Sequence, residues 1–145
     1  MKVILGADHG GFQLKNELKS YITQLGFEVE DLGTNDDESV DYPDYAAAVA
    51  KKVAAGKGIG ILFCRSAAGM VMAANKIHGI RAAAAVDVRS AEHSKEHNNA
   101  NVLALSGDWL TVEDAKDIVK AWLETSFSSV ERHQRRIDKM MALES

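Results

Sequence analysis

The stretch that decides the fold is Val3-Ile4-Leu5-Gly6-Ala7-Asp8-His9-Gly10-Gly11, in which an apolar run leads directly into a glycine-rich turn. A short apolar run of this kind is typical of a buried strand in a parallel sheet. The turn then places an acid, an imidazole and flexible backbone at the end of that strand, where α/β sheets bind ligands. Glycine lets the backbone approach an anion closely, and a following helix presents free N–H groups to it. The turn becomes a stronger indication of a ligand site if other strand ends also carry polar or reactive side chains.

Composition narrows the class of protein. The chain has 145 residues, 46% of them hydrophobic and 26% charged, so we expect one globular domain over residues 1–145. A net charge of −4 argues against a nucleic-acid partner, which needs a clustered basic face. No apolar stretch approaches the roughly 20 residues that cross a bilayer, so we expect no membrane partner. The lone Cys64 excludes an internal disulfide and, with no signal peptide visible, predicts a cytoplasmic location.

Apolar runs of strand length alternate with amphipathic stretches along the whole chain. Strict alternation with short connections predicts a three-layer, Rossmann-like α/β sandwich, in which a five-stranded parallel sheet has helices on both faces. The run at 58–63 is the most apolar and is expected at the centre, whereas 27–32 alternates apolar and acidic residues like an edge strand. We expect strands at 3–6, 27–32, 58–63, 80–86 and 102–105, and helices at 12–25, 42–53, 67–77, 90–97, 111–123 and 130–143.

A second strand end carries Cys64, just before the start of a predicted helix. A helix N-terminus favours the thiolate, and Arg65 adds positive charge nearby. A lone cysteine is also commonly a small buried hydrophobe, so the functional and structural interpretations are evenly balanced here. Ser66 is a candidate hydroxyl donor in a site, the N-cap of the next helix, or both.

We assign His97 and Asn98, which lead into the last predicted strand, as a third polar group at a strand end. Histidine and asparagine in a turn usually only satisfy backbone groups, and that interpretation is favoured for this motif alone. The stretch from His93 to His97 also matches the H-x-x-E-H pattern of inverted zinc peptidases. Such a site needs a third ligand on a following helix, whereas this helix ends after His97, so the sequence argues against zinc.

The last predicted helix carries Arg132 and Arg136, which are four residues apart and therefore share one face. One interpretation is a solvated charged face, with Glu131 pairing locally with Arg135. The other is a two-armed phosphate clamp, for which the planar donor fork of arginine is well suited. The cluster is too short for a polyanion track and suits a single phosphate.

Taken together, these segments resemble the ribose-5-phosphate isomerase B family, which also includes the galactose-6-phosphate isomerase subunits. The resemblance covers nearly the whole chain, and ordered matches at consistent spacing are far more specific than any single motif. The matching segments are 6–11, 41–46, 60–64, 73–76, 79–83, 97–105 and 132–136. On this basis the chain is identified as a member of that family.

The resemblance implies an aldose–ketose isomerisation of a phosphorylated sugar through a cis-enediolate, without metal or organic cofactor. The first expectation is the interconversion of ribose 5-phosphate and ribulose 5-phosphate. The family works as a homodimer with each site built from both subunits, and a tetramer stays open. The helix at about 130–143 is expected to contribute to phosphate binding and to the dimer.

The resemblance also implies roles for single residues. Cys64 matches the base that moves the proton between C1 and C2. Ser66 matches a family threonine that, with His97, opens the furanose ring, while Asp8 and Asn98 match groups that handle the sugar oxygens and the enediolate. The implied phosphate ligands are His9, Arg132 and Arg136.

The start of the predicted helix at 67–77 is expected to complete the catalytic group. Proton abstraction beside a carbonyl needs a stabiliser for the developing oxyanion, and backbone N–H groups can supply one. These N–H groups belong to Ala67, Ala68, Gly69 and Met70. Some family members use a glutamate in place of Met70, so the methionine here supports Cys64 as the base.

The chain departs from the family in the loop after the cysteine, where the family usually has glycines on both sides of Thr or Ser. In this chain, Arg65 and Ala67 stand in place of those glycines. If the family glycines use positive φ or let the sugar approach closely, the two replacements lower stability or narrow the pocket. Alternatively Arg65 points away or contacts a different substrate. The rival functions are therefore an isomerase of a phosphorylated hexose or another sugar, and a catalytically silent protein that binds sugar phosphates.

Overall fold

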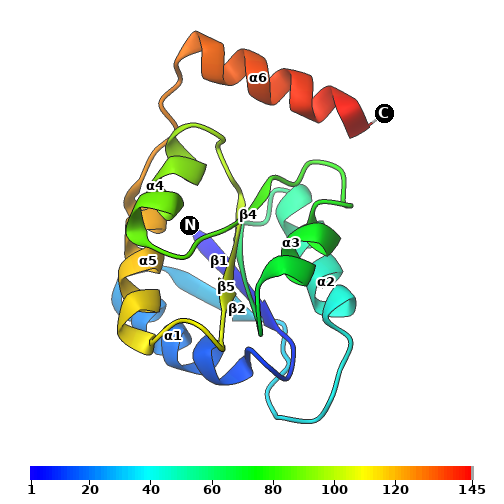
Figure 1. Ribbon diagram of the computed structural model, residues 1–145, viewed down its shortest axis with the longest axis vertical. Coiled ribbons are helices and arrows are strands. Elements are labelled where there is room, and N and C mark those ends of the chain that lie inside the picture. The colour runs from blue at the N-terminus through cyan, green and yellow to red at the C-terminus, as the bar shows by residue number, and fades with distance from the viewer. Residues whose placement is uncertain (145) are drawn as a thin grey trace.

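The computed structural model describes residues 1–144 and has a parallel sheet between two layers of helices (Figure 1). The strands are β1 (Lys2–Ala7), β2 (Glu28–Asp31), β3 (Ile59–Cys64), β4 (Ala82–Ala84) and β5 (Val102–Ser106). The helices are α1 (Phe12–Gln24), α2 (Tyr42–Ala54), α3 (Ala68–Ala74), α4 (Val88–Glu96), α5 (Val112–Glu124) and α6 (Glu131–Met141), followed by the 3-10 turn η1 (Ala142–Glu144). Within residues 1–144, none of these helices is long and apolar enough to cross a membrane.

The five strands run parallel in the order β2-β1-β3-β5-β4, which confirms the predicted sheet. β3 lies at the centre and β2 at an edge, as the apolar content of their sequences predicted. Because side chains alternate along a strand, β3 sends Ile61 and Phe63 to one core, and Leu62 and Cys64 to the other. The helices α1, α4 and α5 cover the first core, and α2 and α3 cover the second (Figure 1).

The fourth strand is shorter than predicted, because β4 spans Ala82–Ala84 rather than 80–86. It is an edge strand that pairs only with β5. On the other side, the amide of Asn75 accepts from the N–H of Ala82 at 2.8 Å and donates to its carbonyl at 3.0 Å. Asn75 thus takes the place of a further strand, and as the C-cap of α3 it also ends that helix before the predicted residue 77.

Helix α6 lies across one end of the molecule, above the amino ends of the strands (Figure 1). Its buried residues are His133 and Ile137, which are one helical turn apart. The 3-10 turn after it contacts the loop before β4, where the N–H of Gly79 donates to Glu144 at 2.9 Å. The two ends of the sheet are therefore chemically different, with the glycine-rich turn at one and α6 at the other.

Candidate active site

A cavity of about 360 Å³ opens at the carboxyl ends of β1 and β3. Asp8 and His9 reach it from the turn after β1, and Cys64 and Ser66 reach it from the end of β3. This confirms that the glycine-rich turn and the cysteine lie together, as expected for the ligand site of a parallel sheet. The residues that line the cavity are Asp8, His9, Tyr42, Cys64, Arg65, Ser66, Gly69 and Met72.

The turn after β1 is stabilised by hydrogen bonds to Asp8, which is part of the turn. The buried carboxylate of Asp8 accepts from the N–H of Gly10 at 2.9 Å, and its carbonyl accepts from Gly11 at 3.1 Å. Gly11 has to be glycine, because a Cβ there would lie 2.3 Å from the carbonyl oxygen of Phe63. The turn therefore packs directly against the end of β3, next to Cys64.

Cys64 is a buried thiol rather than a ready thiolate. Burial raises its pKa, and this outweighs the backbone N–H groups of Ala67, Met70 and Ser66, which act in the opposite direction. The charge of Asp8 raises the pKa further. The N–H groups at the start of α3 lower the pKa, as expected of a helix N-terminus, but desolvation is the larger effect, so the thiolate is not favoured overall in the free chain.

The loop after Cys64 contains a strained alanine. Ala67 has φ 73° and ψ −21°, in the left-handed region that favours glycine, and it is the N-cap of α3. Of the two conditions under which replacing the family glycine would matter, positive φ is therefore the one met by Ala67 in this chain. Ser66 is not the cap, but its Oγ accepts from the N–H of Ala68 at 3.4 Å. Met70 is fully buried, whereas Gly69 lines the cavity under the ring of Tyr42.

The remaining predicted site residues do not reach this cavity within one chain. The strand register pairs Cys64 with Ser106, at the carboxyl end of β5, whereas His97 and Asn98 precede its amino end. The length of β5 between these two edges is about 13 Å. His97 and Asn98 therefore lie at the opposite sheet edge from Cys64 in a single chain, because they lead into a strand rather than follow one.

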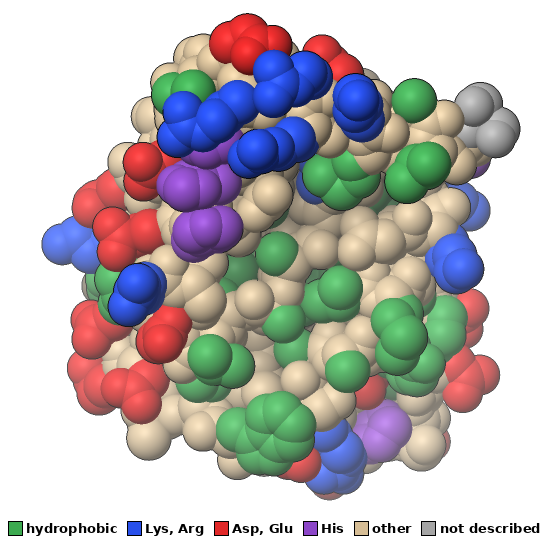
Figure 2. All heavy atoms as spheres, turned by 45° about the horizontal axis from the view of Figure 1, so that its top comes forward, with side chains coloured by type: hydrophobic (Ala, Val, Ile, Leu, Met, Phe, Trp, Pro, Cys, Tyr) green, Lys and Arg blue, Asp and Glu red, His purple; other side chains and the backbone are tan. Residues whose placement is uncertain are grey.

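His97 belongs instead to a stack of three imidazoles at the amino edge. Its ring centroid lies 4.1 Å from that of His93 and 4.3 Å from that of His133. Figure 2 shows histidine side chains gathered next to a group of Lys and Arg side chains. Arg132 and Arg136 flank His133 in the sequence of α6. One chain therefore carries two separate clusters, the cysteine pocket at one sheet edge and this histidine–arginine cluster at the other.

His133 is a residue of this cluster that the sequence did not single out. Its ring is buried, and Nδ1 lies 2.8 Å from Oγ of Ser128. Burial lowers its pKa, and the neighbouring charges of His97, Arg132 and Arg136 lower it further. The helical spacing of His133 and Ile137 is the signal that could have placed this ring on the inner face of α6.

The zinc-peptidase interpretation of the stretch from His93 to His97 finds no support. The two histidines of the H-x-x-E-H pattern, His93 and His97, stack on one another, and residues 1–144 contain no group of three or more His, Cys, Asp or Glu side chains that could hold a metal.

On α6, Arg135 pairs with Glu131 at 2.9 Å, as predicted, which separates it from Arg132 and Arg136.

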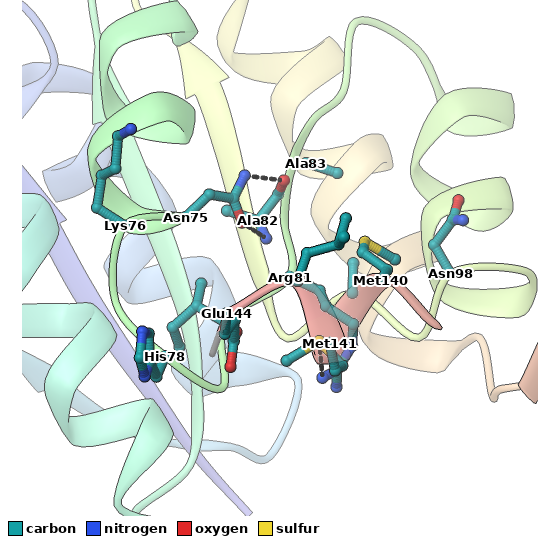
Figure 3. Close-up of a pocket in the computed structure, with 13 residues that line it drawn as sticks. Asn75, Lys76, His78, Arg81, Ala82, Ala83, Asn98, Met140, Met141 and Glu144 are labelled. Atoms are coloured by element: carbon teal, nitrogen blue, oxygen red, sulfur yellow. Dashed lines mark hydrogen bonds between the residues drawn. The ribbon is translucent and has the colours of Figure 1, made fainter. Parts of the chain in front are cut away.

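A larger cavity of about 580 Å³ lies between α3, β4 and the end of α6 (Figure 3). Arg81 crosses it to donate to the sulfur of Met141 at 3.7 Å, and Asn98 forms part of its wall. Met140 and Leu143 also line it and are 40% and 83% exposed, so apolar surface is open at this place. This cavity is separate from the cysteine pocket.

Comparison with known proteins identifies the family. The family model of the ribose/galactose isomerases matches residues 3–140. The chain belongs to this family. Among curated members it is 44% identical to the putative sugar phosphate isomerase YwlF of Bacillus subtilis over 142 residues, which is 97% of this chain and 95% of that protein. It is 43% identical to ribose-5-phosphate isomerase B of Escherichia coli over 144 residues, 99% of this chain and 96% of that protein.

Solved structures of the family share the fold. Ribose-5-phosphate isomerase B of Clostridium thermocellum superposes with a TM-score of 0.97 at 43% identity, over 99% of this chain and 97% of that one. The enzyme of Mycoplasma genitalium with bound ribulose 5-phosphate superposes with a TM-score of 0.94 at 40% identity, over 99% and 95% of the two chains. The α/β architecture of this chain is thus that of the family.

Proposed function

We propose that this chain interconverts ribose 5-phosphate and ribulose 5-phosphate, with Cys64 as the base. The observation that carries the proposal is the cavity at the carboxyl ends of β1 and β3, which holds Cys64 beside Asp8, His9 and Ser66. Relatives that cover nearly the whole chain are ribose-5-phosphate isomerases B, and one of them binds ribulose 5-phosphate.

The reaction moves one proton between neighbouring carbons of the open-chain sugar. Because the pKa of Cys64 is raised in the free pocket, the thiol must first lose its proton to solvent. The thiolate then removes the proton from C2 of the aldose, the C–H electron pair forms the C1–C2 double bond, and negative charge collects on the C1 oxygen. The sulfur then returns the proton to C1, and the proton of the C2 hydroxyl passes to the C1 oxygen, so that the ketone forms at C2 and a hydroxyl at C1. The N–H groups of residues 68–70 are the donors that we assign to the enediolate oxygens.

The two clusters of one chain suggest how the site is completed. We propose a homodimer in which the cysteine pocket of one subunit faces the histidine–arginine cluster of the other. A two-fold axis makes the two contacts equivalent, so each dimer has two identical sites. His97 and Asn98 then act on the ring and the sugar oxygens, and Arg132 and Arg136 bind the phosphate. The exposed apolar surface beside α6 is the kind of surface that a second copy covers.

The position of Arg65 argues against the silent alternative. Its side chain is 63% exposed and its Nη1 lies 3.5 Å from Oδ2 of Asp108, so it does not fill the space above Cys64. A phosphorylated hexose is the remaining rival substrate. The test is a turnover assay with ribose 5-phosphate, arabinose 5-phosphate, galactose 6-phosphate and glucose 6-phosphate. We expect the highest kcat/KM for ribose 5-phosphate, whereas binding without turnover of any of the four would contradict an isomerase.

A further inference from the structure

Arg65 brings positive charge to the cysteine pocket. Among residues 1–144, it is the only lysine or arginine that lines the cavity. Its aliphatic stem lies over the turn after β1, because a Cβ on Gly10 would be 2.4 Å from its Cγ. The stem of Arg65 therefore passes over Gly10, the residue next to His9, and both Arg65 and His9 line the cavity.

His9 presents a hydrogen-bond donor to the same cavity. Its Nδ1 accepts from the backbone N–H of Val40 at 3.2 Å. In a neutral imidazole the proton then resides on Nε2, which is left to bind a ligand. His9 and Arg65 thus give the cavity two nitrogen donors from neighbouring segments of one chain.

The present partner of Arg65 holds it weakly. The distance from Nη1 to Oδ2 of Asp108 is 3.5 Å, and the two side chains are 63% and 44% exposed. An exposed ion pair of this length contributes little, because water screens both charges. A phosphate offers more charge and can accept two parallel hydrogen bonds from one guanidinium, so it competes well with Asp108.

We propose that Arg65 is a further ligand of the substrate phosphate, supplied by the same chain as Cys64, and that Asp108 holds it when the site is free. This inference rests on the proposed function, and His9 is the phosphate ligand that the family resemblance implies in this pocket. The phosphate is then held by His9 and Arg65 from one subunit and by Arg132 and Arg136 from the other. Arg65 replaces a family glycine, so this ligand is specific to chains that carry arginine here.

The test compares variants at both ends of the ion pair. Arg65→Met keeps the stem over Gly10 but removes the charge, and we expect a KM for ribose 5-phosphate about tenfold higher with kcat changed less than threefold. Asp108→Asn frees the guanidinium, so KM is expected to stay equal or fall. A role confined to holding the loop predicts the same change in both variants. The matched control is Arg135→Met, which removes another exposed, ion-paired arginine, on α6, and should leave KM unchanged.

A second measurement separates this proposal from the proposed function. Calorimetry gives the dissociation constant of inorganic phosphate without any turnover, and we expect Arg65→Met to weaken that binding about tenfold. If no aldose phosphate is turned over, the proposed function fails, while this result still decides the role of Arg65. Equal phosphate binding by the wild type and Arg65→Met would overturn the proposal, and so would an equal loss in Arg135→Met.

Discussion

The backbone N–H of Ala67 donates to Sγ of Cys64 at 3.0 Å, from a residue held at φ 73°. The contact fixes the thiol at the start of α3, but it requires a backbone conformation that alanine adopts only with strain. The site is therefore built on a local conflict between side chain and backbone, which glycine would relieve.

We expect Ala67→Gly to raise the free energy of unfolding by about 1 kcal/mol, because glycine adopts positive φ without a Cβ clash. Urea denaturation measures the change. The control is Ala48→Gly at an exposed position inside α2, where the same substitution should lower stability by about 1 kcal/mol. Destabilisation by both substitutions would show that residue 67 is not strained.

The buried thiol predicts a distinct pH dependence. Only the thiolate reacts with iodoacetamide, and burial raises the pKa of Cys64 above its ordinary value of 9.0. Alkylation of the free protein should therefore be slow at neutral pH and should keep accelerating above pH 9. Since Cys64 is the only cysteine, the rate of modification reports on it alone. Full reactivity below pH 7 would contradict a thiol whose pKa is raised.

Lys15 and Asp31 form a buried pair that supports the turn side of the sheet. The fully buried ammonium of Lys15 lies 2.7 and 2.8 Å from the two carboxylate oxygens of Asp31 and 2.6 Å from Oδ1 of Asn35. Burial acts to raise the pKa of Asp31, but hydrogen bonds from Lys15 and the N–H of Gly33 outweigh it, and the pKa is lowered. The stabilisation that the pair contributes is therefore fully present above about pH 4, the pKa of Asp31 in the unfolded chain. It is lost as the pH falls through the lower pKa of Asp31 in the folded protein.

We expect Asp31→Asn to lower the free energy of unfolding by about 3–5 kcal/mol, because it leaves the Lys15 charge buried without its counter-ion. Below pH 4, the free energy of unfolding of the variant should also decrease less steeply with falling pH than that of the wild type. Lys19→Ala removes the exposed partner of the same carboxylate, at 3.3 Å, and should cost less than about 1 kcal/mol. Equal effects of the two substitutions in urea denaturation would contradict this account.

The sequence was sufficient to predict the parallel sheet and the grouping of residues in the cysteine pocket. Alternation of apolar and amphipathic stretches predicted the parallel sheet, and the glycine-rich turn correctly pointed to the pocket that contains Asp8, His9 and Cys64. The length of β4 could not be predicted, because it depends on Asn75, a residue of another element that bonds the strand edge.

Two features of the site have physical causes that the single motifs did not reveal. His97 and Asn98 precede β5 and therefore lie at the opposite sheet edge from Cys64, which ends β3. The pKa of Cys64 is raised overall, which its motif did not indicate, because neighbours in sequence reveal the helix N-terminus but not the depth of burial. The role of His133 depends on which face of α6 packs inward, which is a tertiary property.

The most direct test of the shared site is complementation between inactive subunits. We expect Cys64→Ala and Arg136→Ala each to lose most activity as homodimers, since each disables one half of every site. In a mixed dimer, one site combines both defects and the other is intact. Random exchange of equal amounts makes half of the dimers mixed, so about a quarter of the wild-type activity should return.

The matched control pairs Arg132→Ala with Arg136→Ala, which disable the same half of the site, so mixing should restore nothing. Activity is measured with ribose 5-phosphate after the subunits have been unfolded and refolded together. Recovery of about a quarter of the activity for Cys64→Ala with Arg136→Ala, and none for the control, is the result that the shared site predicts. No recovery from mixed dimers of Cys64→Ala and Arg136→Ala would contradict it.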